Sequence, residues 1–441
     1  MPVARGAWSG WCAAFALVGA GSLSANRPST INVVVAGDTQ GYLAPCGCTS
    51  PMTGGIRRLA TAVAQYRGTG GLFLENGGLL EENPRGLVAL RQGVLKALAL
   101  ADAFRAMRVD AVNIGQEELT AGPGTLTQIE ELTDRATLST SLEPSATNNL
   151  PQWLAHGPFL IGGVTPAAVN LAAITGETAV PVKAAVHRLA EEALKRGLTP
   201  ILMFRGTEPQ AEAFARDEPG LALIVYQSAG TAPLAPIVIG HTMLVTPGDQ
   251  TKNLVRLEFD GTAFSNYRAV TLTPNYADEP KVSKIYRSYQ AQVGHAHLIE
   301  LLPRTKTAAF AGSAACASCH GAAFKIWHAS AHSHALADLE RQGSERDPEC
   351  VGCHVTGLAS TVGFRSRLQT RKLADVSCEA CHGPAQAHAH APRTYRLPKL
   401  TEKSCLGCHT PNNSPNFAFS TFWPKVSHRL TPLHGDNLGK P

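Results

Sequence analysis

Short hydrophobic runs alternate with amphipathic stretches over the first 260 residues of the chain. The runs are rich in β-branched and aliphatic residues and end at glycine or polar residues, which is typical of strands; they cover 31–36, 72–74, 111–115 and 221–226. Between them, hydrophobic residues at helical spacing predict helices over 56–66, 87–107 and 186–197. Strands alternating with helices predict an α/β domain in which helices cover a sheet, with a site among the polar residues at strand ends.

Helical spacing returns over 279–302 and then stops. The hydrophobic positions of this stretch are Val282, Ile285, Tyr286, Tyr289 and Val293. Pro303 ends the predicted helix, which would link the α/β domain to the rest of the chain.

The segment beyond this helix repeats one five-residue word four times, as CASCH, CVGCH, CEACH and CLGCH. Two thiols separated by two residues can form thioethers with one porphyrin, and the next histidine can bind its iron. The words therefore predict four covalently attached haems c, numbered here in chain order, on Cys316, Cys319 and His320; Cys350, Cys353 and His354; Cys378, Cys381 and His382; and Cys405, Cys408 and His409. A pair of zinc ribbons would not require a histidine after every second cysteine.

Length and composition agree with two globular domains. The chain has 441 residues, of which 44% are hydrophobic and 17% charged, so it is neither disordered nor embedded in a membrane. The formal charge of +5 is small, and haem propionates would offset it, so nothing favours a nucleic-acid partner. The cysteines outside the four words are Cys12, Cys46 and Cys48.

Residues 1–25 have the features of a secretory signal peptide. Arg5 provides a basic start, and the apolar run from Trp8 to Ala20 is too short to span a bilayer. Small residues at 22–25 offer a cleavage site, and cleavage there would remove Cys12. We therefore expect a periplasmic or otherwise exported protein whose mature chain has no transmembrane segment.

The polar residues at the predicted strand ends carry a resemblance to a known family. Gly37-Asp38-x-Gln40-Gly41, then Asn76-Gly77 and Ile114-Gly115-Gln116-Glu117-Glu118-Leu119 resemble the motif order of the secreted 5′-nucleotidase branch of the calcineurin-like metallophosphatases. The resemblance implies a metallophosphatase-like sandwich. In those enzymes the motif residues hold two divalent metals that activate a water.

This chain departs from that family at several metal positions. Gln40 stands for a histidine, Asn76 for the bridging aspartate, Gln116 and Glu117 for an asparagine–histidine pair, and Gln227-Ser228 for a late histidine pair. A neutral amide lacks the charge that holds two dications together. We therefore predict a scaffold without its dinuclear centre and no divalent metal in this domain; His241 is interpreted as an ordinary loop or strand histidine.

Cys46 and Cys48 form a separate feature of this half. Together with Gly54-Gly55-Ile56-Arg57-Arg58 they resemble a nucleotidase-like subgroup with a Pro-Cys-Gly-Cys motif. A disulfide across one residue is strained and labile, so a redox dithiol or a soft-metal site is one hypothesis. A structural or inert pair is the other.

The haem words and their surroundings resemble the cytochrome c554 family. The similar segments include Trp327-His328-Ala329-Ser330-Ala331-His332, the run after His354, and Cys378-Glu379-Ala380-Cys381-His382-Gly383-Pro384. The ending, with Phe422-Trp423-Pro424-Lys425-Val426 and His428, resembles a C-terminal cap of related multihaem modules. Together these resemblances imply His332, His388 and His428 as distal iron ligands, with His334 and His390 as near-duplicates of the first two. The cytochrome c554 resemblance also implies an open or weakly ligated iron at haem 2, which the spare histidines His434, His328 or His295 could close; His297 also lies near the haem segment.

Three functional hypotheses follow. The first is an exported tetrahaem electron carrier that exchanges electrons with redox partner proteins, with an N-terminal pseudo-phosphatase platform. The second is a haem-dependent oxidoreductase that acts on a small nitrogen or oxygen species at haem 2, and the third is a metal-dependent phosphoesterase. The expected organisation is a signal peptide (1–25), a metallophosphatase-like domain (30–275), a linker helix (276–305) and a mostly helical or irregular tetrahaem cytochrome c domain (306–441).

Overall fold

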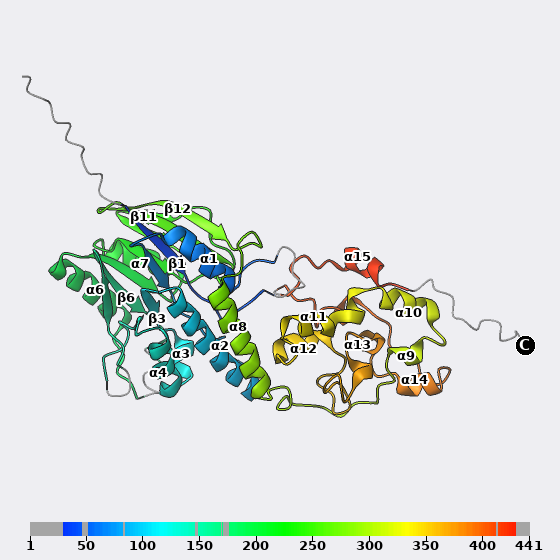
Figure 1. Ribbon diagram of the computed structural model, residues 1–441. Helices are drawn as coiled ribbons and strands as arrows, with labels where there is room; N and C mark the ends of the chain where they lie inside the picture. The colour runs from blue at the N-terminus through cyan, green and yellow to red at the C-terminus, as the bar shows by residue number, and fades with distance from the viewer. Residues whose placement is uncertain are drawn as a thin grey trace, which may run out of the picture.

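The computed structural model describes residues 30–45, 52–82, 84–145, 149–168, 170, 176–411 and 413–428. The first of two six-stranded sheets has the order β12-β11-β1-β2-β3-β4 (Figure 1). Strands β1 to β4 run parallel, and β11 and β12 extend the sheet antiparallel. Their bounds are β1 Ile31–Ala36, β2 Leu72–Glu75, β3 Ala111–Asn113, β4 Thr137–Leu138, β11 Asn253–Phe259 and β12 Phe264–Thr271.

The second sheet has the order β5-β6-β7-β8-β10-β9. Its inner strands β6, β7, β8 and β10 are parallel, while β5 and β9 pair antiparallel at the two edges. Their bounds are β5 Trp153–His156, β6 Phe159–Val164, β7 Thr199–Phe204, β8 Leu223–Tyr226, β9 Ile237–Ile239 and β10 Thr242–Val245.

The two sheets pack face to face, and helices cover their outer faces. In β1, Val33 and Val35 point into the core between the sheets, whereas Val34 and Ala36 point to the core under the helices. This period of two explains why both faces of the strand are hydrophobic. The helices are α1 Ile56–Arg67, α2 Gly86–Ala106, α3 Gln116–Thr120, α4 Pro123–Leu132, α6 Val182–Arg196 and α7 Glu208–Asp217. The predicted α/β sandwich is confirmed.

The predicted linker helix is part of this sandwich. Helix α8 (Pro280–His295) lies beside α2, and its Val282, Tyr289 and Val293 are buried in the same core as α1 and α2. In Figure 1, α2 and α8 form the side of the N-terminal domain that faces α11 and α12. The helix is therefore a rigid support for the segment that follows.

The C-terminal segment consists of short helices and irregular chain, as predicted. Its elements are α9 Ser313–Cys316, α10 Gly321–His328, η1 Ala331–His334, α11 Ala335–Gln342, α12 Pro348–His354, η2 Arg371–Leu373, α13 Cys378–His382, α14 Gln386–His390, η3 Glu402–Ser404, α15 Phe419–Phe422 and η4 Trp423–Lys425. One small hydrophobic cluster around Val351 and Leu373 holds α11 and α12 together. Helices α10, α14 and α15, all within the described residues, bury no side chain of their own.

No helix in the described part of the chain is long and apolar enough to cross a membrane.

Candidate functional site

A single large cavity of about 2760 Å³ brings all four words together. Pockets for one small molecule measure roughly 300–1,000 Å³, so this space suits several large groups. The twelve predicted attachment residues all line it: Cys316, Cys319, His320, Cys350, Cys353, His354, Cys378, Cys381, His382, Cys405, Cys408 and His409. Among the described residues, these cysteines form no disulfide with one another.

Local helical structure sets the spacing of the thiols. The second word forms the end of α12, and the third word is the whole of α13. Residues three apart lie on the same side of a helix, so in these two words both cysteines face the cavity. The histidine that follows ends the helix.

Three pairs of histidine rings face each other across the cavity. The ring centroids are 6.3 Å apart for His320 and His388, 5.9 Å for His382 and His428, and 6.3 Å for His332 and His409. Each imidazole nitrogen lies about 2 Å from a metal that it binds, so two rings on opposite sides of one metal would have centroids about 6 Å apart. The observed spacing fits such a metal between each pair.

The structure separates the predicted distal histidines from their near-duplicates. His332, His388 and His428 line the cavity, whereas His334 and His390 are not among the residues that line it. His334 instead faces His328, with ring centroids 6.0 Å apart. Sequence spacing alone leaves each of these choices open.

Hydrogen bonds determine which ring nitrogen is available. Nδ1–H of His354 donates to the Ala335 carbonyl over 2.6 Å, and Nδ1–H of His388 donates to the Tyr395 carbonyl over 2.7 Å. A carbonyl only accepts, so in the neutral form of each ring the lone pair is on Nε2, which is the usual arrangement in metal-binding histidines. Burial lowers the pKa of His320, His332, His382 and His409, which favours the neutral form that binds metals.

His354 differs from the other three proximal candidates. No ring pair among the described residues joins it to another histidine, and His295, one of the spare histidines, is exposed and hydrogen-bonded to Ala291 in its own helix. His434, Cys12, Cys46 and Cys48 lie outside the described residues.

The cavity fits covalently bound porphyrins on chemical grounds. Paired thiols, neutral imidazoles and a space too large for one small ligand come together there. Helices with no buried side chain surround the space, and helices of four to eight residues are not stable alone in water. Large apolar groups in the cavity would give these helices a core.

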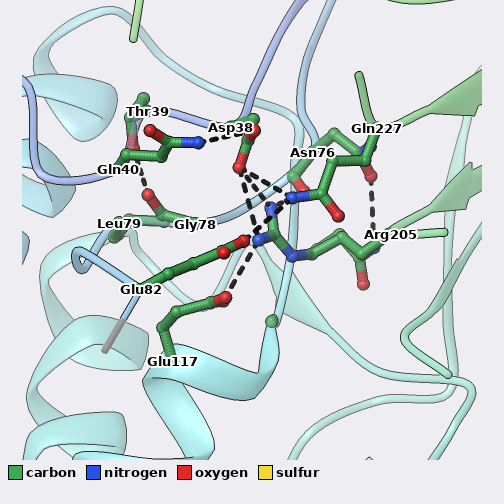
Figure 2. A network of polar contacts seen from close by, with 12 residues as sticks. Asp38, Thr39, Gln40, Asn76, Gly78, Leu79, Glu82, Glu117, Arg205 and Gln227 are labelled. Atoms are coloured by element: carbon green, nitrogen blue, oxygen red, sulfur yellow. Dashed lines mark hydrogen bonds and ion pairs between the residues drawn. The ribbon is translucent and has the colours of Figure 1, made fainter. Parts of the chain in front are cut away.

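A separate polar cluster lies in the N-terminal domain, where the carboxyl ends of β1, β2, β3, β7 and β8 converge (Figure 2). At its centre is Arg205, the residue after β7, which is buried. Its guanidinium lies 3.4 Å from Asp38 Oδ1 and 3.1 Å from Glu117 Oε2, and it donates to the Asn76 carbonyl over 3.2 Å. Glu75 and Glu118 are buried nearby. The buried part of the cluster therefore contains four carboxyl groups and one arginine.

Glycines make the room that the guanidinium occupies. A Cβ at Gly78 would lie 2.8 Å from Arg205 Nη1, and one at Gly115 would lie 2.6 Å from Arg205 Nε. Gly78 also has a φ of +75°, which side chains disfavour. The strand ends are thus shaped around the arginine.

Several of the predicted departures from the metallophosphatase pattern lie in this cluster. Gln40 and Gln227 each donate to Asp38, over 3.1 Å in both cases, and the Asn76 amide donates to the backbone carbonyls of Phe204 and Val225. Ser228 pairs with Thr246 instead. These amides act as donors, which is the opposite of a metal ligand.

Burial and neighbouring charges together determine which groups of the cluster are protonated. Burial raises the pKa of Asp38 and raises that of Glu75 well above its ordinary value. Burial alone would lower the pKa of Arg205, but the carboxylates of Glu117, Glu118 and Asp38 raise it. The guanidinium is the permanent cation of this site, and the residues do not fit a dinuclear metal centre.

One residue considered in the sequence analysis, His241, lies away from both sites. His241 is exposed between β9 and β10, in the turn that joins them. Arg205 was not predicted, because the strand that positions it, 199–204, was not identified from the hydrophobic pattern.

Residues 315–383 match the family profile of cytochrome c554 and c-prime. Over 94 residues the chain is 34% identical to cytochrome c-554 from Nitrosomonas europaea; the match covers 18% of this chain and 40% of that protein. The comparison therefore spans less than half of the curated relative.

The N-terminal part has the fold of the nucleotidases. A candidate 5′-nucleotidase from Staphylococcus aureus, solved with alpha-ketoglutarate, matches with a TM-score of 0.50 at 12% identity, over 71% of this chain and 66% of that one. A 5′-nucleotidase precursor from Thermus thermophilus matches with a TM-score of 0.48 at 18% identity, over 71% and 68%. The chain thus joins a domain of metallophosphatase-like fold to a segment that matches the cytochrome c554 family.

Proposed function

We propose that this chain is an exported, periplasmic tetrahaem cytochrome that carries electrons between redox partner proteins. The observation that supports this most directly is the set of three histidine pairs across one cavity, each at the spacing expected for two ligands of one iron. The N-terminal domain serves as a platform without phosphatase chemistry. The proposed organisation keeps the predicted bounds, with domains at 30–275 and 306–441 joined by 276–305. Helix α8, within the joining stretch, packs into the core of the first domain.

In this proposal each pair of histidines holds one haem. His320 and His388 hold haem 1, His382 and His428 hold haem 3, and His409 and His332 hold haem 4. A bound haem supplies a one-electron iron couple, and ligation by two histidines leaves no position for a substrate. Cys316 and Cys378 line the same cavity, and the Cys378 N–H donates to Ser313 Oγ in the helix that ends at Cys316, which supports close approach of haems 1 and 3.

A haem-dependent oxidoreductase is the second candidate function. It is favoured by His354, which lines the cavity with an available Nε2 and has no histidine facing it among the described residues. A five-coordinate iron at haem 2 could bind a small nitrogen or oxygen species.

Electron paramagnetic resonance of the oxidised full chain tests both candidates, after a pyridine haemochrome assay has established four haems. One high-spin haem in four that converts on addition of cyanide supports an open haem 2. Four low-spin haems leave only the electron carrier. Two or more high-spin haems would contradict the proposed histidine pairs.

A phosphoesterase is opposed by the position of Arg205. We expect no manganese-dependent hydrolysis of a chromogenic nucleotide ester. Robust turnover that Asp38→Ala abolishes would contradict the pseudo-phosphatase interpretation.

A further inference from the structure

The helix that carries the second word is held at its start by the N-terminal domain. Asp347, the N-cap of α12, is buried, with 3% of its surface exposed. Its carboxylate accepts hydrogen bonds from Gln92 Nε2 over 2.6 Å, Gln290 Nε2 over 3.2 Å and the Tyr289 hydroxyl over 3.3 Å. It also accepts from the Glu349 backbone N–H over 3.0 Å. Three of the four donors thus belong to α2 and α8.

A second contact lies one turn further along α2. Lys96 Nζ lies 2.5 Å from the carboxylate of Glu349. Gln92 and Lys96 are four residues apart and therefore lie on one face of the helix. This face of α2, together with Tyr289 and Gln290 of α8, contacts the first turn of α12; we call it the α2–α8 face.

The first and third words are anchored differently. The buried carboxylate of Glu379, inside the third word, accepts from the backbone N–H groups of Ala311, Gly312 and Ala385. The N–H of Cys378 donates to Ser313 Oγ. These contacts all lie within the C-terminal segment.

The α2–α8 face also forms part of the cavity wall beside the second word. Gln92, Lys96, Tyr289 and Gln290 line the same cavity as Cys350 and His354. The N-terminal domain therefore borders the space that haem 2 would occupy.

We propose that the N-terminal domain sets the reduction potential of haem 2 through the charge of Asp347. This inference rests on the proposed attachment of a haem to Cys350 and Cys353. A buried carboxylate favours the more positive, oxidised iron and so lowers the potential, because interactions between charges are strong where water is excluded. Donors from the α2–α8 face partly offset that charge. A displacement of this face would thus change the potential of one haem and leave the other three unchanged.

Two substitutions with opposite electrostatic consequences test the proposal on the full, haem-loaded chain. Asp347→Asn removes the charge and keeps the helix start, since Asn caps helices as well as Asp does. It should raise the midpoint potential of one haem. Gln92→Leu removes a donor and leaves the charge, and should lower the potential of the same haem. Tyr289→Phe, a milder change, should lower it less.

Glu379→Gln is the matched control, because it neutralises a buried carboxylate beside a different word. It should raise the potential of another haem. Spectroelectrochemical titration resolves the four midpoints. The proposal would be overturned if Asp347→Asn and Gln92→Leu shifted the midpoint potential in the same direction. Equal shifts of all four haems, or unchanged midpoint potentials, would also overturn it.

Failure of the proposed function gives a different result. Mass spectrometry of tryptic peptides from the wild-type chain would then find Cys350 and Cys353 without haem. If four haems are attached, the midpoint potentials of the variants alone show whether Asp347 sets the potential of haem 2.

Discussion

Replacement of Arg205 by methionine tests whether the guanidinium has taken the place of metal ions in the N-terminal domain. Methionine has a similar length and flexibility but no charge. The substitution would leave Asp38 and Glu117, whose side chains are 4% and 3% exposed, without their cation.

The expected loss of stability is several kcal/mol. At the 3.1 Å separation of Arg205 and Glu117, one charge pair is worth about 5 kcal/mol at an effective dielectric constant of about 20. Removal of one partner of a buried ion pair typically costs about 3–5 kcal/mol. Each kcal/mol corresponds to roughly 2–4 °C of melting temperature in a domain of about 150–250 residues, so we expect a decrease of roughly 6–20 °C.

The loss should depend on pH. Without the arginine, the pKa of Asp38 rises further above its value in the unfolded chain, so the folded state retains a proton that the unfolded state releases. Stability then falls as pH rises through that folded pKa. The variant should therefore be less impaired at pH 5 than at pH 8.

Urea titration followed by far-UV circular dichroism measures these effects on the full haem-loaded chain. Arg188→Met is the control, since Arg188 and Glu143 form an exposed ion pair, with 45% and 39% of their side chains accessible, and such pairs contribute about 1 kcal/mol or less. A loss below about 1 kcal/mol for Arg205→Met at pH 8, or a greater loss at pH 5, would refute the reasoning.

Three further predictions concern single residues. Burial raises the pKa of Glu75 well above 4.5, so the folded state keeps a proton that the unfolded state releases, and the free energy of unfolding falls as pH rises above 4.5. Glu75→Gln should therefore be more stable than wild type at pH 8. Equal stability in urea titrations would contradict this. His388→Ala should convert one low-spin haem, the partner of His320, to high spin in electron paramagnetic resonance; an unchanged spectrum would contradict the pairing. Gly363→Ala should lower the melting temperature strongly, because its Cβ would lie 1.6 Å from the Gly357 carbonyl oxygen, whereas Gly321→Ala meets no atom within 4 Å and should change it little.

Hydrophobic patterning predicts the N-terminal sandwich because buried hydrophobic residues recur along each strand or helix with the period of that element. The run from 31 to 36 coincides with β1, and the stretches at 56–66 and 87–107 coincide closely with α1 and α2. The strand at 199–204 was missed, since it follows α6 after only two residues and merges with its hydrophobic pattern. Consequently the residue that it positions, Arg205, was missed as well.

The four proposed haem words can be recognised in the sequence because attachment needs a fixed local spacing. The proposed distal ligands, in contrast, come from distant parts of the chain. His332 pairs with His409, which is far away in sequence, and nothing local distinguishes it from His334. The role of Asp347 also depends on partners in α2 and α8. Such contacts become visible only when the fold brings those elements together.

The absence of buried side chains in α10, α14 and α15 has a consequence for biogenesis. The hydrophobic clusters of the sandwich are complete by Leu302, so this domain can fold as soon as it has been synthesised. Among its described residues, the C-terminal segment has one small hydrophobic cluster, around Val351 and Leu373. In the proposed cytochrome, the attached porphyrins would supply the apolar groups that these helices lack. The folded domain then offers the α2–α8 face as a template, and maturation can begin at the second word.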